Sequence, residues 1–124
     1  MGRGFLTGKI DAKTTFETND FRGQIPRFTP DARSANQTLI DSLGNMSRAK
    51  GATPAQVALA WLLAKAPWIV PLFGTRRVER LDENLGALAV TLTAQEFAAI
   101  DQMSAGFKPQ GERYPEQFIK FSES

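Results

Sequence analysis

One short apolar run constrains the fold of this 124-residue chain more than any other feature. Residues 68–73 (WIVPLF) carry β-branched side chains at their centre, which suits a strand buried in a parallel sheet. Pro71 counts against a regular ladder, because proline has no N–H to donate. The other periodic segments are helical. The sequence therefore predicts a mainly α-helical chain with one short buried strand.

Apolar spacing and capping signals place the helices. We expect helices over residues 34–50, 54–66, 76–86 and 94–104. Gly51 should end the first helix, and capping boxes should open the second at Thr53 and the fourth at Thr93.

The third helix should bury a stripe of apolar side chains on one side, made of Val78, Leu81, Leu85 and Leu88. Residues 1–33 are expected to be a loop. Residues 105–124 are expected to be a terminal arm with room for a last helical turn.

Composition excludes several kinds of site. The chain has no cysteine and no histidine, which excludes disulfides, histidine-based triads and the usual zinc ligands, so we predict no metal site. A formal net charge of +2 makes nucleic acid a weak hypothesis. The apolar runs are shorter than the roughly 20 residues that cross a bilayer, and the first residues lack a signal-peptide pattern. We expect no membrane partner and a cytoplasmic location.

The residues that follow the predicted strand suit a phosphate group. Gly74 and Thr75 precede a helix whose free N–H groups and dipole favour an anion. Arg76, Arg80 and Asn84 are spaced four apart, which places them on one helical face. Spacing alone favours a simpler interpretation, in which Thr75 is an N-cap and the arginines are solvated surface residues.

Several motifs in order resemble the aldo-keto reductase family. WIVPLFGTRRVERLDENLGAL, followed by TLTAQEFAAID, resembles the eighth strand and helix of these enzymes. GRGFLTGKI resembles the loop after the seventh strand, KGATPAQVALAWLL the helix between them, and GERYPE the family's end. The resemblance implies that residues 1–124 are the C-terminal part of an α/β protein, a (β/α)8 barrel. Such barrels bind NADPH without a Rossmann fold, and no G-x-G-x-x-G motif occurs here.

The resemblance also implies roles in binding NADP(H). It assigns the adenosine 2′-phosphate to Gly74, Thr75, Arg76 and Arg80, the adenine amino edge to Glu83 and Asn84, and the pyrophosphate to Gly2 and Arg3. Simpler interpretations remain open. Glu83 could form an ion pair with a neighbouring arginine, Asn84 could be a polar residue late in a helix, and the first glycines could belong to a flexible end.

Family members reduce aldehydes or ketones to alcohols with a tetrad of Asp, Tyr, Lys and His. The resemblance places that tetrad outside this chain, and the one tyrosine, Tyr114, lies in the terminal arm, so we predict no catalytic residue. We expect a cofactor-binding fragment of an NADP-dependent oxidoreductase of small carbonyl compounds, inactive alone. The alternative is a truncated, non-enzymatic helical module that associates through its apolar faces, because a lone strand leaves its edges open.

Overall fold

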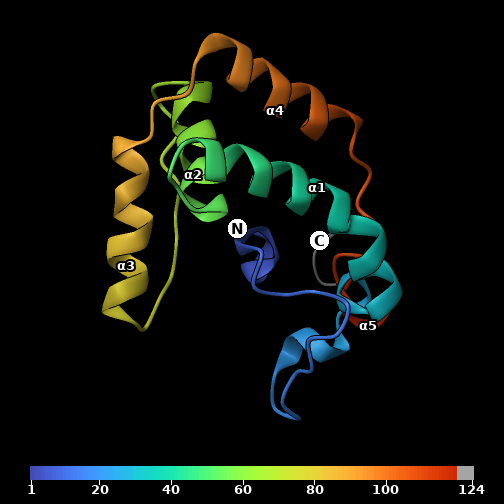
Figure 1. Ribbon diagram of the computed structural model, residues 1–124. Helices are drawn as coiled ribbons and strands as arrows, with labels where there is room; N and C mark the ends of the chain where they lie inside the picture. The colour runs from blue at the N-terminus through green and yellow to red at the C-terminus, as the bar shows by residue number, and fades with distance from the viewer. Residues whose placement is uncertain (120–124) are drawn as a thin grey trace. The chain divides into compact units, whose positions relative to one another are not determined.

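The computed structural model describes residues 1–119 (Figure 1). The chain divides into two compact units. The first unit is Met1–Lys9 with Leu39–Phe107, and the second is Ile10–Thr38 with the described residues from Lys108 onward. Within residues 1–119 every regular element is an α-helix or a 3-10 helix. None of these described helices is long and apolar enough to cross a membrane.

The mainly helical character predicted from the sequence is confirmed. The α-helices are α1 Pro30–Ala49, α2 Pro54–Lys65, α3 Val78–Leu85, α4 Ala94–Gly106 and α5 Glu116–Ile119. The 3-10 helices are η1 Gly2–Thr7, η2 Phe21–Gln24, η3 Pro26–Phe28 and η4 Gly86–Ala89. Helix α1 begins at Pro30 rather than residue 34, and α3 begins at Val78 rather than residue 76.

Local sequence signals set most helix ends as predicted. The Gln56 N–H donates to Thr53 Oγ1 at 3.2 Å, and the Thr53 N–H donates to Gln56 Oε1 at 3.0 Å. Thr93 and Glu96 form the same reciprocal pair at the start of α4. Gly51 ends α1 in the left-handed region, with φ +62°, which glycine adopts without steric cost.

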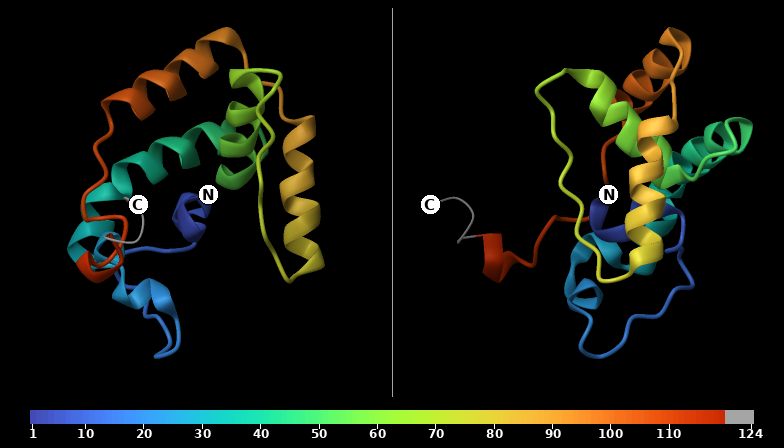
Figure 2. Two further views of the ribbon diagram at one scale, coloured as in Figure 1. Left: turned by 180° about the vertical axis from the view of Figure 1, so that it is seen from behind. Right: turned by 90° about the vertical axis from the view of Figure 1, so that its left-hand side faces the viewer.

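Helix α2 is the central element of the first unit (Figures 1 and 2). It contacts α3, α4, η1 and η4. Val57 of α2 has no exposed surface and packs with Leu43 of α1 and Ile100 of α4. Half-buried apolar side chains surround this core: Leu6, Leu39, Met46, Ala52, Trp61, Val90, Leu92 and Met103. The N-terminal half of α2 is therefore firmly held.

The prediction of a buried strand over residues 68–73 is wrong for this chain. Trp68, Val70 and Leu72 are 81%, 77% and 96% exposed. The residues between them are half-buried, so exposure alternates as it does along an extended chain. A strand needs a hydrogen-bonded neighbour and a covering layer. Residues 1–119 supply neither to this segment.

The apolar stripe predicted on the third helix is also exposed. Val78, Leu81, Leu85 and Leu88 are 70%, 40%, 48% and 75% exposed. The buried residue of α3 is Asn84. The periodicity identified the apolar face, but no described element covers it, and α3 buries part of its polar face instead.

The first 33 residues are not the plain loop that was predicted. They contain η1, η2, η3 and the first turn of α1. In the second unit, Ile25 and Phe28 are buried. Arg33 is buried beside them, and its Nη1 donates to the carbonyls of Asp11 at 2.5 Å and Thr14 at 2.7 Å. These contacts order the segment, although its composition resembles that of a loop.

The terminal arm continues the second unit. The Arg27 Nε donates to the Gly111 carbonyl at 3.0 Å, and the Arg27 N–H donates to the Glu112 carbonyl at 3.2 Å. The arm then forms the helical turn α5 over Glu116–Ile119. The remaining predicted arm residues, 120–124, lie outside the described part of the chain.

Candidate functional site

The first unit contains a cavity of about 430 Å³ between η1, α2 and α3. This volume falls in the range of about 300–1,000 Å³ that is typical of small-molecule sites. The predicted cofactor residues that line it are Arg3, Gly74, Thr75, Arg80, Glu83 and Asn84. Residues from opposite ends of the unit's sequence thus meet around one space.

Two predicted residues, Gly2 and Arg76, do not line this cavity. Arg76 precedes α3, so it does not share a helical face with Arg80 and Asn84 as predicted. The Arg77 N–H donates to Thr75 Oγ1 at 3.2 Å, and Arg77 is extended, with φ −118° and ψ 129°. This turn delays the start of the helix.

Arg77, not Thr75, is the N-cap residue of α3, and no side chain caps the helix start. The simple N-cap interpretation of Thr75 is therefore wrong. The first N–H groups of an α-helix have no partner within the helix. Without a side-chain cap, the N-terminal end of α3 keeps its attraction for negative charge.

Arg3 reaches the cavity from a tight left-handed turn. Gly2, Arg3 and Gly4 have φ values of +57°, +53° and +96°. Such angles suit glycine, whereas they are uncommon for a residue with a side chain. The Gly4 N–H donates to the Met1 carbonyl at 3.1 Å and closes the turn. The GRG sequence therefore places Arg3 at the cavity wall.

The charges of the cavity wall are predominantly positive. Arg3 and Arg80 line it, and Glu83 is its only acidic lining residue among those described. The Glu83 carboxylate lies 3.9 Å from the Nζ of Lys9, so its ion pair is with a lysine, where the simpler interpretation had a neighbouring arginine. The cavity wall thus has two arginines and one carboxylate, and guanidinium groups bind anionic ligands through paired hydrogen bonds.

The sequence prediction missed several lining residues: Met1, Gly4, Thr7, Ala55, Leu72 and Phe73. The Thr7 hydroxyl donates to the Gly4 carbonyl at 2.6 Å and accepts the Lys9 N–H at 3.3 Å. A hydroxyl within the glycine-bearing loop could have indicated Thr7. Ala55 carries no chemical signal, and only the packing of α2 places it at the wall.

A second cavity of about 420 Å³ lies near the start of α2 and is lined partly by Lys50 and Glu96. Their side chains form an ion pair of 2.9 Å. The Lys50 ammonium holds the pKa of the Glu96 carboxyl below its usual value, and the Thr93 N–H adds to this effect. Because the two charges neutralise each other, this cavity has less to attract an ion than the first.

The family is decided by comparison with known proteins. The model of the aldo/keto reductase family matches residues 1–105. The chain belongs to the aldo/keto reductase family. The fold of this family is a (β/α)8 barrel, and the described part of this aldo/keto reductase chain contains helices without a strand.

Named relatives agree with this assignment. The chain is 37% identical over 113 residues to "Aldo-keto reductase str7" of Strobilurus tenacellus, a match that covers 91% of this chain and 34% of that protein. It is 38% identical over 115 residues to "Aldo-keto reductase yakc [NADP(+)]" of Schizosaccharomyces pombe, covering 93% of this chain and 34% of that protein. The aldo/keto reductase chain thus spans about a third of the length of these curated relatives.

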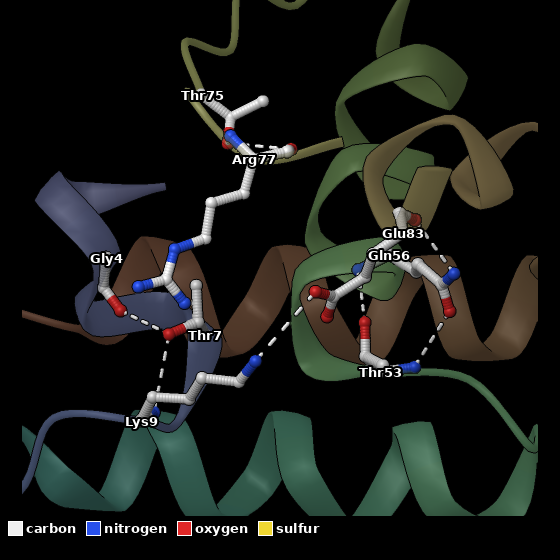
Figure 3. A network of polar contacts seen from close by, with 8 residues as sticks. All are labelled: Gly4, Thr7, Lys9, Thr53, Gln56, Thr75, Arg77 and Glu83. Atoms are coloured by element: carbon white, nitrogen blue, oxygen red, sulfur yellow. Dashed lines mark hydrogen bonds and ion pairs between the residues drawn. The ribbon is translucent and has the colours of Figure 1, made fainter. Parts of the chain in front are cut away.

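One polar network connects α2 to the cavity-lining end of α3 in this aldo/keto reductase chain (Figure 3). The Gln56 Nε2 donates to the Glu83 carbonyl at 2.8 Å. Its Oε1 accepts the Thr53 N–H, and the Glu83 side chain faces Lys9. The backbone that carries Glu83 and Asn84 is therefore tied to the start of α2.

Proposed function

We propose that the cavity between η1, α2 and α3 binds the adenosine 2′-phosphate end of NADP(H). The observation that carries this proposal is that three residues assigned to the 2′-phosphate by the resemblance line one cavity: Gly74, Thr75 and Arg80. Arg3, which the resemblance assigns to the pyrophosphate, lines the same cavity. Guanidinium groups make strong, geometrically specific hydrogen bonds to phosphate. The relative yakc of Schizosaccharomyces pombe is named for NADP(+), which agrees with a ligand that carries this phosphate.

Gly74 fits this role because its surroundings are open. A Cβ built on Gly74 would meet no atom within 4 Å. A ligand can therefore approach the backbone at this position. Arg76 and Gly2 do not line the cavity. Their roles, Arg76 at the 2′-phosphate and Gly2 at the pyrophosphate, stay predictions from the sequence.

Glu83 and Asn84 are proposed to recognise the adenine base. The Asn84 side chain is 9% exposed and lines the cavity with Glu83. A carboxylate accepts a hydrogen bond from an amino group, and a side-chain amide both donates and accepts. These two side chains can therefore match the amino edge of adenine.

The whole protein is proposed to be an oxidoreductase that reduces the carbonyl group of a small aldehyde or ketone. The nicotinamide of the bound cofactor supplies hydride in that chemistry. The residues of this chain contribute binding and orientation of the adenosine end. The family tetrad is proposed to come from residues outside these 124, and no catalytic residue is assigned within them.

Isothermal titration of the full chain with adenosine 2′,5′-bisphosphate tests this proposal, with 5′-AMP as the ligand that lacks the 2′-phosphate. Arg80→Ala should weaken binding of the bisphosphate about 10- to 100-fold, the range expected for a lost hydrogen bond between charged groups, and change 5′-AMP binding little. Arg48→Ala, an exposed arginine of α1, is the matched control and should leave both affinities unchanged. Equal affinity of the wild-type chain for the two ligands would contradict a 2′-phosphate site.

A second function is favoured by the exposed apolar side chains of the first unit. Trp68, Val70 and Leu72 lie on one face of an extended segment, and Val78 and Leu88 are also strongly exposed. Exposed apolar patches commonly mark association surfaces. We therefore propose that the chain also associates with further copies of itself through the face formed by Trp68, Val70 and Leu72. Sedimentation velocity should show that Val70→Lys lowers the associated fraction, and an unchanged distribution would contradict this role.

A further inference from the structure

The backbone near the C-terminal end of α3 accepts a hydrogen bond from a side chain of α2. The last carbonyl groups of an α-helix have no partner within the helix. The Gly86 N–H donates to the carbonyls of Asn84 and Asp82. The carbonyl of Glu83 accepts a hydrogen bond from the Nε2 of Gln56 at 2.8 Å. Glu83, whose carbonyl accepts this bond, and its neighbour Asn84 both line the cavity.

Gln56 has little freedom to move because both ends of its amide are used. The side-chain Oε1 accepts the Thr53 N–H at 3.0 Å, and the side-chain Nε2 donates to the Glu83 carbonyl. The backbone N–H of Gln56 donates to Thr53 Oγ1 at 3.2 Å. Its neighbour Ala55 is 2% exposed and lines the same cavity. The bond from the Thr53 N–H, which does not involve the threonine hydroxyl, therefore orients the Gln56 amide toward α3.

Gly86 provides the space for this contact. A Cβ at Gly86 would lie 2.4 Å from Gln56 Nε2. The backbone of Gly86 is right-handed helical, with φ −57° and ψ −16°, which residues with side chains also adopt. A side chain at position 86 would therefore displace the Gln56 amide, whereas the backbone angles there would accept one.

We propose that Gln56 is a positioning residue for adenine recognition, and that Gly86 is the glycine that lets it act. This role rests on the proposed function of the cavity. Gln56 fixes the backbone of Glu83 relative to α2, and thereby positions the side chains of Glu83 and Asn84. Neither Gln56 nor Gly86 lines the proposed cofactor cavity. Their effect on the ligand is therefore indirect, through the last turn of α3.

Gln56→Glu tests the donor specifically. The carboxylate still accepts the Thr53 N–H, but it cannot donate to the Glu83 carbonyl. The readout is the ratio of the affinities for adenosine 2′,5′-bisphosphate and inosine 2′,5′-bisphosphate, which differ at the amino edge of the base. We expect Gln56→Glu to reduce this ratio about three- to tenfold, the range for one lost neutral hydrogen bond.

Thr53→Ala is the matched control. It removes the hydroxyl of the capping box and should lower the melting temperature, but it leaves the bond from Gln56 to Glu83 in place. The ratio should therefore stay at its wild-type value. An equal loss of the ratio in Thr53→Ala would show that general stability, and not positioning, controls recognition, and would overturn the proposal.

Gly86→Ala provides a second and independent test. Alone, it should reduce the ratio, because the new methyl group displaces the Gln56 amide. In a Gln56→Ala background the same change should have no further effect, because the shortened side chain leaves room. An effect of the same size in both backgrounds would overturn the steric link.

Binding measurements on the wild-type chain separate the proposed function from the positioning role of Gln56. Absence of bisphosphate binding by the wild type would overturn the proposed function together with this inference. Binding by the wild type with an unchanged ratio in Gln56→Glu would overturn the positioning role alone.

Discussion

Asn36 and Gln110 exchange two hydrogen bonds although they lie 74 positions apart. The Asn36 Nδ2 donates to the Gln110 carbonyl at 3.1 Å, and the Gln110 N–H donates to Asn36 Oδ1 at 2.8 Å. Asn36 is 3% exposed. One buried side chain thus satisfies both backbone groups of Gln110 and holds the terminal arm to α1 within the second unit.

Asn36→Ala should destabilise the second unit by about 1–3 kcal/mol, because it removes two hydrogen bonds that contribute about 0.5–1.5 kcal/mol each. Hydrogen exchange of the Gln110 amide should lose its protection, and urea unfolding should give the change in free energy. Ser34→Ala, at an exposed position of the same helix, should change stability by less than about 0.5 kcal/mol. Retained protection of Gln110 in Asn36→Ala would contradict this account.

Gly111 should not tolerate a side chain. Its φ is +84°, and a Cβ there would lie 2.6 Å from the Arg27 Cα. Gly111→Ala therefore combines backbone strain with a clash against main chain, and should cost about 1–3 kcal/mol or more in urea unfolding. Gly106→Ala in α4 is the control, since a Cβ there meets nothing within 4 Å. It should be neutral or stabilising by up to about 1 kcal/mol.

The features that the sequence predicted correctly are local. The pairs Thr53 with Gln56 and Thr93 with Glu96 are three residues apart, so the interacting groups are specified within one helical turn. Gly51 ends α1 for an equally local reason, its left-handed φ. Burial depends on distant elements instead. The sequence pattern around Leu85 and Val70 identified apolar faces. It could not predict that these faces stay exposed within the described part of the chain.

In the candidate site, too, the sequence predicted local relationships and missed a contact between residues far apart in the chain. The spacing of Arg80 and Asn84 predicted that they share a helical face, and in the structure both line the cavity. Arg76 was misplaced because a threonine hydroxyl two residues before Arg77 can delay a helix start as readily as it can cap one. The contact between Gln56 and the Glu83 carbonyl spans 27 positions, and no sequence motif indicates it.

The stability of the first unit should fall in acid partly through Asp101. The Lys65 ammonium, and then the Trp61 N–H, hold the pKa of the Asp101 carboxyl below its usual value. A lowered folded-state pKa contributes stability that is present above the unfolded-state pKa and is lost as pH falls through the folded-state value. This contribution is therefore complete near pH 7 and is lost progressively below about pH 4.

Asp101→Asn should abolish that part of the pH dependence. The variant keeps an oxygen that can accept the Trp61 N–H but has no charge to pair with Lys65. Urea unfolding at pH 7 and pH 3 should show the wild-type chain losing more stability than the variant. Parallel losses in both proteins would mean that Asp101 contributes nothing to the acid response.

Fluorescence of the two tryptophans should distinguish the covered from the uncovered surface of the first unit. Trp68 is 81% exposed, whereas Trp61 is half-buried and its Nε1 donates to Asp101 Oδ1 at 2.8 Å. Trp61→Phe, which leaves Trp68, should emit at long wavelength and be readily quenched by acrylamide. Trp68→Phe, which leaves Trp61, should emit at shorter wavelength and be quenched less, and it should change unfolding by less than about 0.5 kcal/mol. Blue-shifted, protected emission from Trp68 would mean instead that residues 68–73 are covered, as the sequence pattern predicted.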